Sequence, residues 1–139
     1  MSFREKSAWI SFISILLLFG IYFAAVGFAM AGRLSYSQTF SLFVQLVIAL
    51  VVLEVVSHVA VAMRAPLDAR VPADEREKLI NLRAHRIAGN TLAVGVLIAI
   101  FTLHLGADRR ELAHAALLAL AISQLAKYAT EIALHRRDT

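Results

Sequence analysis

Six polar side chains lie within apolar stretches of this chain, where a lipid environment makes them energetically costly. They are Glu54, His58, Asn90, Gln124, Lys127 and Glu131. Glu54 and His58 are four residues apart, and so are Lys127 and Glu131, so each pair shares one face of a helix. An acid and an imidazole opposite an ammonium and a second acid have the chemistry of a buried ion pair or of a proton path.

This polar layer has three interpretations. The one we favour is structural, with Glu54 and Lys127 paired so that neighbouring helices stay in register. The others are proton or ion transport through the same groups, and the binding of a ligand. Helical side chains tilt toward the N-terminus, which points Glu54 and Lys127 deeper into the membrane. Because leaving either group in lipid costs about 2.5–3.5 kcal/mol, pairing inside the protein is expected.

A second candidate site lies where the third apolar stretch ends and the fourth begins. His104 and His114 flank a short turn that also carries Asp108 and Glu111. Histidine with carboxylate suits zinc or another divalent metal, and two facing imidazoles suit haem. Histidines at a membrane surface more often bond to water or backbone, so the metal or haem site is the weaker hypothesis and the cofactor stays open.

Four long apolar stretches must position these groups. They cover residues 8–31, 40–63, 87–105 and 112–134 in a chain that is 60% hydrophobic and only 17% charged. Each is near the ~20 residues that cross a bilayer, and a lipid-exposed backbone must be helical there. Short connections between consecutive helices predict antiparallel neighbours. We therefore expect an all-α membrane protein, a single domain folded as an up-down four-helix bundle.

The first apolar stretch has a rival interpretation as a cleaved signal peptide, since basic residues precede it and small residues end it. It is longer than the roughly 7–15 apolar residues of a signal-peptide core, so a retained first helix is expected. The basic residues give the orientation. Ten lie at the N-terminus, in the middle loop or at the C-terminus, namely Arg4, Lys6, Arg64, Arg70, Arg76, Lys78, Arg83, Arg86, Arg136 and Arg137. Three lie on the other side, Arg33, Arg109 and Arg110. This bias predicts that both termini are cytoplasmic.

The middle loop is the longest polar segment. From about residue 73 it has the pattern of a helix that extends the third apolar stretch by two to four turns into the cytoplasm. Its early acids suit a helix N-terminus, and Asp74 and Lys78 are spaced as an i,i+4 ion pair. It is most simply a solvated helix end, and otherwise a surface for a cytoplasmic protein or for lipid headgroups. That surface would consist of Asp74, Glu75, Arg76, Lys78, Leu79, Leu82, Arg83 and Arg86.

Small residues recur at helical spacing in two of the apolar stretches. Gly20, Ala24, Gly27 and Ala31 share one stripe of the first, and Gly95 and Ala99 do so in the third. Such stripes let helix backbones approach closely, mostly within one chain and otherwise between copies. We expect a homo-oligomer.

Two segments carry a resemblance to other proteins. Residues 3–11 read FREKSAWIS and residues 74–80 read DEREKLI. The chain resembles a family of small, uncharacterised four-helix membrane proteins of bacteria. The resemblance implies a location in the bacterial inner membrane and brings no activity with it.

Several functional classes are disfavoured. The chain has no cysteine, which excludes disulfides and thiolate chemistry. Its basic residues flank apolar stretches, so nucleic acid is not the expected partner. Small multidrug exporters carry an essential acid in the first helix, which here has no charge between Trp9 and Gly32. No nucleophile–base pair points to an enzyme. A structural, regulatory or partner-binding membrane component is favoured, and a small oligomeric proton- or ion-coupled carrier is the alternative.

Overall fold

The computed structural model describes residues 3–30, 32, 35–64 and 74–137. Some positions named above lie outside the described residues: Ala31, Arg33, Arg70 and residue 73, at which the extension of the third helix is predicted to begin.

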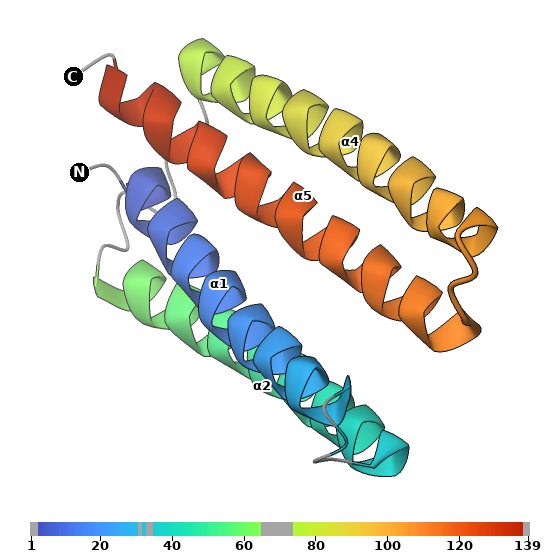
Figure 1. Ribbon diagram of the computed structural model, residues 1–139. Helices are drawn as coiled ribbons and strands as arrows, with labels where there is room; N and C mark the ends of the chain where they lie inside the picture. Colours follow the sequence, from blue (N-terminus) through green and yellow to red (C-terminus); the bar gives the residue numbers. More distant parts are fainter. Residues whose placement is uncertain (1–2, 31, 33–34, 65–73, 138–139) are drawn as a thin grey trace. The chain divides into compact units, whose positions relative to one another are not determined.

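The described chain is all-α and contains no strand within those ranges. Its four helices are α1 (Phe3–Met30), α2 (Tyr36–Arg64), α4 (Glu75–His104) and α5 (Arg109–Arg137) (Figure 1). Each is long and apolar enough to cross a membrane, over Arg4–Phe28, Phe40–Ala60, Glu75–His104 and Arg109–Arg137. The prediction of four helices is confirmed, and their length and composition suggest a membrane protein. α2 and α5 run past the predicted apolar limits at both ends, and α1 and α4 do so at their starts, because polar turns continue the helices there.

The chain divides into two compact units, Met1–Val71 and Pro72–Thr139. The helices of each unit, α1 with α2 and α4 with α5, pack against each other as an antiparallel pair (Figure 1). The predicted antiparallel neighbours are therefore confirmed within each hairpin. The assembly of both hairpins into one up-down bundle, and hence a single domain, stays a prediction.

Contacts between α1 and α2 fix the register of the first hairpin. Ser11 bonds to Glu54, and the ring of Tyr22 lies 5.5 Å from that of Phe43, measured between centroids. Eleven residues forward along α1 thus correspond to eleven residues back along α2. The buried positions of α1 lie on this same face and include Ala8, Ile15 and Val26.

The second hairpin packs along a seam of small residues. On α4 the seam contains Ala84, Ala88, Gly95 and Ala99, spaced by four, seven and four residues and so aligned on one face. Gly95 lies so close to α5 that a Cβ added to it would be 2.6 Å from the Cβ of Ala119. The predicted close-packing role of the Gly95 stripe is thus served within the chain.

Large apolar side chains of the second hairpin lie on its outside. Val94, Leu97 and Phe101 on α4 are exposed, while the buried residues of the two helices are mostly small, with Ile80 and Ile132 buried near the open end of the hairpin. Soluble helical hairpins have the reverse arrangement, with their large apolar groups inside. Small residues between helices and large apolar ones outside are typical of packing in a bilayer, where lipid covers the outer surface.

The small-residue stripe of α1 differs from that of α4. Gly20 and Gly27 have no atom within 4 Å of an added Cβ, and Ala24 between them is exposed. This stripe does not pack against α2 in the described part of the first hairpin. Its predicted alternative, contact with a second copy, stays a prediction.

The third apolar stretch and its polar extension form one unbroken helix. α4 begins at Glu75 after the N-cap Asp74, whose carboxylate accepts a hydrogen bond of 2.7 Å from the Glu77 backbone N–H. The Glu77 carboxylate in turn accepts from the Asp74 backbone, which completes a capping box. The expected Asp74–Lys78 ion pair is wrong for this reason. Lys78 Nζ instead donates to Glu75 Oε1 at 2.9 Å.

Candidate functional site: a carboxylate inside the first hairpin

Glu54 lies well inside the apolar part of α2. It is ten residues from the end of that helix at Arg64, or about 15 Å along the axis at 1.5 Å per residue. The neighbouring residues Leu53, Val55 and Val56 are all apolar and exposed. A carboxylate at this depth needs partners from the protein, since lipid offers none.

One oxygen of Glu54 has a partner on the facing helix. The hydroxyl of Ser11 on α1 donates a hydrogen bond of 2.8 Å to Oε2. Ser11 is 1% exposed, so this bond lies within the helix contact and away from the surface. The other oxygen, Oε1, is buried and has no hydrogen-bond partner among the described residues. One oxygen of the carboxylate therefore has a donor on the facing helix, and the other oxygen is buried without one.

His58 lies one turn from Glu54 on the same face of α2. Its Nδ1 is 2.7 Å from the backbone carbonyl oxygen of Glu54 and 3.4 Å from Oε2. A carbonyl oxygen only accepts hydrogen bonds, so Nδ1 carries a hydrogen. Glu54 and His58 were expected to share one face of the helix, and they do, with the acid and the imidazole in contact through the Nδ1 edge.

The predicted polar residues of the second hairpin do not pair with one another. Lys127 and Glu131 form no ion pair with each other among the described residues, and Lys127 Nζ lies 4.8 Å from the ring centroid of Tyr128. This placement is a cation–π contact. Lys127, Glu131 and Gln124 are half-buried, whereas Asn90 is exposed.

The first hairpin therefore brings together Glu54 and His58 as expected and adds Ser11, which the sequence reasoning missed. The available signal was the spacing of Ser7, Ser11 and Ser14, which share one face of an otherwise apolar helix. The convergence of Glu54 with Lys127 and Glu131 of the second hairpin stays a prediction.

The turn between α4 and α5 uses its acids for helix capping. Gly106 adopts a φ of +91° in this turn, a conformation that glycine tolerates. Asp108 Oδ1 accepts hydrogen bonds from the backbone N–H groups of Glu111 and Arg110, at 2.9 and 2.7 Å. Glu111 Oε2 accepts from the Asp108 N–H at 2.9 Å. These two backbone hydrogen bonds lower the pKa of Asp108 from its ordinary value of 3.8, and the bond from the Glu111 N–H has the larger effect.

Two histidines, His104 and His114, flank this turn. His104 is exposed and its ring stacks on Phe101 with 6.0 Å between centroids. The ranges that the structure describes contain no group of three or more His, Asp or Glu side chains that could hold a metal ion. A metal or haem at His104 and His114 stays a prediction.

Comparison of this chain with known protein families, with curated proteins and with solved structures finds no match.

Proposed function

We propose that this protein is a structural or regulatory component of a membrane, in which the Glu54 layer holds membrane helices in register. The observation that carries the proposal is the unpartnered Oε1 of Glu54, buried beside the Ser11 bond. A buried carboxylate with one unsatisfied oxygen gains most from a fixed donor on another helix. The ammonium of Lys127 is the donor that we propose, and a helix of a partner or of a second copy is the other source.

A double-mutant cycle tests this role. Glu54→Gln, Lys127→Met and the double variant are unfolded reversibly in detergent, and the free energies of unfolding are compared. We expect a coupling energy above about 0.5 kcal/mol, because residues that interact directly deviate from additivity by that much or more. Glu75→Gln is the matched control, since Glu75 is 90% exposed and its carboxylate pairs with Lys78 on the same helix.

Additivity of Glu54→Gln and Lys127→Met would exclude a direct pair between these two residues. In that case, if the protein forms a stable oligomer and Glu54→Gln dissociates it, Glu54 still has a structural role and its donor lies on another copy. If Glu54→Gln changes neither folding nor assembly, the structural role is refuted.

A second candidate function uses the same carboxylate for proton or ion transport. It is favoured by the neighbouring imidazole of His58, whose Nδ1 lies 2.7 Å from the backbone carbonyl oxygen of Glu54. Proteoliposomes with an internal pH dye measure it. A carrier requires a flux that Glu54→Gln abolishes without loss of folding and that Glu75→Gln leaves unchanged.

The location and the partners belong to the same proposal. The excess of Lys and Arg at the N-terminus, the middle loop and the C-terminus supports an orientation with both termini in the cytoplasm. The bacterial inner membrane is the location that the resemblance of residues 3–11 and 74–80 implies. The exposed stripe at Gly20 and Gly27 supports self-association. The first turns of α4, which carry Glu75, Arg76 and Lys78, would present their charged side chains to a cytoplasmic protein.

A further inference from the structure

The outer face of α4 changes character in a regular order along the helix. One stripe, with spacings of three and four residues, contains Leu79, Arg83, Arg86, Asn90, Val94, Leu97 and Phe101. All seven are exposed, whereas Ala84, Ala88 and Ala99 of the seam are buried. Two guanidinium groups are thus followed by one amide and then by large apolar side chains.

We propose that this stripe, which we call the α4 outer stripe, binds an anionic phospholipid of the surrounding bilayer. Arg83 and Arg86 would hold the phosphate, Asn90 the ester oxygens, and the apolar residues an acyl chain. The proposal depends on α4 crossing a bilayer and is independent of the role of Glu54.

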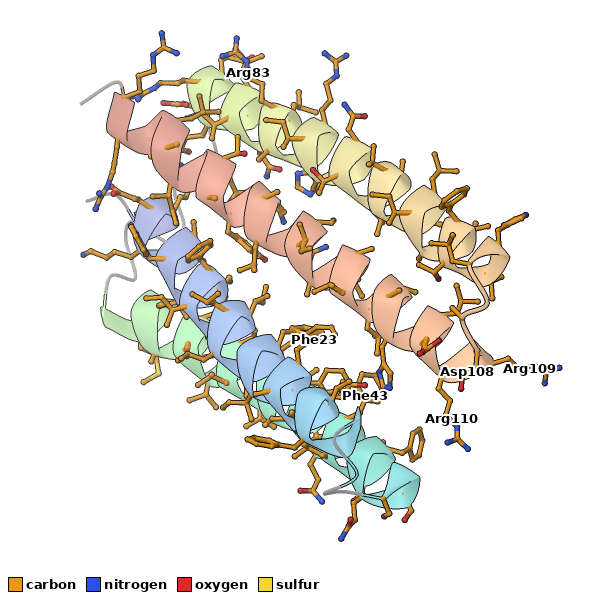
Figure 2. The ribbon with its side chains drawn as sticks, in the orientation of Figure 1. Phe23, Phe43, Arg83, Asp108, Arg109 and Arg110 are labelled. Atoms are coloured by element: carbon orange, nitrogen blue, oxygen red, sulfur yellow. The ribbon has the colours of Figure 1, made fainter. Side chains whose placement is uncertain are left out.

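The charge of the stripe matches the headgroup. Figure 2 shows Arg83 on the side of α4 away from α5. Arg86 is exposed one turn further along the same stripe. The acids nearby are engaged elsewhere: Glu75 pairs with Lys78, and Asp74 and Glu77 form the capping box. Guanidinium groups bind phosphate through two parallel hydrogen bonds. The net negative charge of an anionic lipid, which a zwitterionic lipid lacks, adds further attraction to the two arginines.

The depths along the stripe match those of a lipid. Asn90 lies four residues below Arg86, about 6 Å along the helix, where an amide N–H₂ can donate to ester oxygens. Phe101 is eleven residues below Asn90, or about 16 Å, close to half of the ~30 Å hydrocarbon core. Leu97 and Phe101 are 67% and 61% exposed, which leaves them open to an acyl chain.

The opposite end of the same hairpin provides a matched control. Arg109 and Arg110 lie at the start of α5, beside Asp108 (Figure 2). Replacing both removes the same charge from the same hairpin without altering the outer stripe.

Native mass spectrometry of the purified protein tests the proposal, with phosphatidylglycerol and phosphatidylcholine of identical acyl chains as probes. We expect tighter binding of phosphatidylglycerol to the unaltered protein. R83Q/R86Q should weaken it by about thirty-fold, since each basic residue near an anionic surface contributes a factor of about five. N90L should weaken it several-fold, and R109Q/R110Q should leave it within about two-fold of the unaltered protein.

Three results would overturn the proposal. One is equal binding of both lipids, and another is an equal loss in R83Q/R86Q and R109Q/R110Q. The third comes from L97C, since the chain has no other cysteine. Efficient disulfide-linked dimers of L97C in membranes would mean that a second copy covers the stripe. Helix content measured by circular dichroism identifies any variant that fails to fold, and Lys replacements at positions 83 and 86 then serve as milder substitutes.

Discussion

The Ser11 hydroxyl on α1 donates a hydrogen bond of 2.8 Å to the Oε2 atom of Glu54 on α2. This hydrogen bond joins a side chain of α1 to a side chain of α2 at the depth of the Glu54 carboxylate. The bond connects residues 43 positions apart and helps to fix how α1 and α2 lie against each other.

Ser11→Ala removes this bond and leaves the Glu54 carboxylate without its donor on α1. We expect the first hairpin to lose about 0.6 kcal/mol, and up to about 1.7 kcal/mol, the range for hydrogen bonds between membrane helices. Reversible unfolding in detergent measures the loss. Ser14→Ala is the control, because Ser14 is buried on the same helix and makes no described bond to Glu54. Equal losses in both variants would mean that the bond contributes nothing specific.

Gly95→Ala places a methyl group against α5. The new Cβ would lie 2.6 Å from the Cβ and 3.2 Å from the Cα of Ala119, so the helices must separate. We expect a loss of about 1–3 kcal/mol, as for overpacking elsewhere. Gly89→Ala on the same helix meets open space and should be neutral or stabilising.

A compensating change sharpens the test of the seam. Ala119→Gly in the Gly95→Ala background restores the space, and it should recover part of the lost free energy of unfolding. Failure of Ala119→Gly to recover any stability would contradict close packing of Gly95 on Ala119.

Asp74→Ala should destabilise the start of α4 more than Lys78→Ala does. Loss of an N-cap costs about 1 kcal/mol. The Lys78–Glu75 pair is exposed, and breaking it costs about 0.5 kcal/mol or less. Hydrogen exchange of the first-turn amides of α4 compares the two variants. Equal protection in both would restore the rejected Asp74–Lys78 interpretation.

Asp108 makes the second hairpin sensitive to acid. Its pKa is lowered in the folded state because the ionised carboxylate accepts the Glu111 and Arg110 N–H groups. The contribution to stability is therefore fully present above the ordinary pKa of 3.8 and is lost as pH falls through the lower, folded-state value. Melting temperatures of the unaltered protein and of Asp108→Ser, measured from pH 6 downward, should converge below about pH 4 because serine caps without titrating. A constant difference throughout would contradict this linkage.

Single-cysteine labelling tests the proposed topology, since the chain has no cysteine of its own. Ser37→Cys near the start of α2 should react with an impermeant maleimide in intact cells. Thr139→Cys at the C-terminus should react only after the cells are opened. The opposite pattern would invert the orientation predicted from the basic residues.

Hydropathy was sufficient to predict the four helices because each apolar stretch is long enough to cross a bilayer by itself. The helix ends were predicted less well, since they depend on local capping. The spacing of Asp74 and Glu77 fits a capping box. The i,i+4 rule, which predicts an Asp74–Lys78 ion pair, holds only within a helix, and Asp74 lies just outside it.

The partner of Glu54 could not be predicted from one helix alone. Pairing across helices depends on register, and register follows from side-chain packing that hydropathy does not encode. The i,i+4 pair of Glu54 and His58 was predictable because it lies within one helix. Lys127 and Glu131 have the same spacing, but among the described residues they form no ion pair, and Lys127 instead lies against the ring of Tyr128. The i,i+4 spacing therefore allows two side chains to meet, and the surrounding side chains determine whether they do.

The small-residue seam between α4 and α5 has a thermal consequence. Parting these helices within a bilayer exposes Gly95 and its alanine neighbours to acyl chains instead of water. The heat-capacity increase of unfolding comes from the hydration of apolar surface, so separation in lipid should produce very little of it. The free energy of separating α4 from α5 should therefore change almost linearly with temperature. Water-soluble helix pairs differ, because their free energy of unfolding curves with temperature and falls again in the cold.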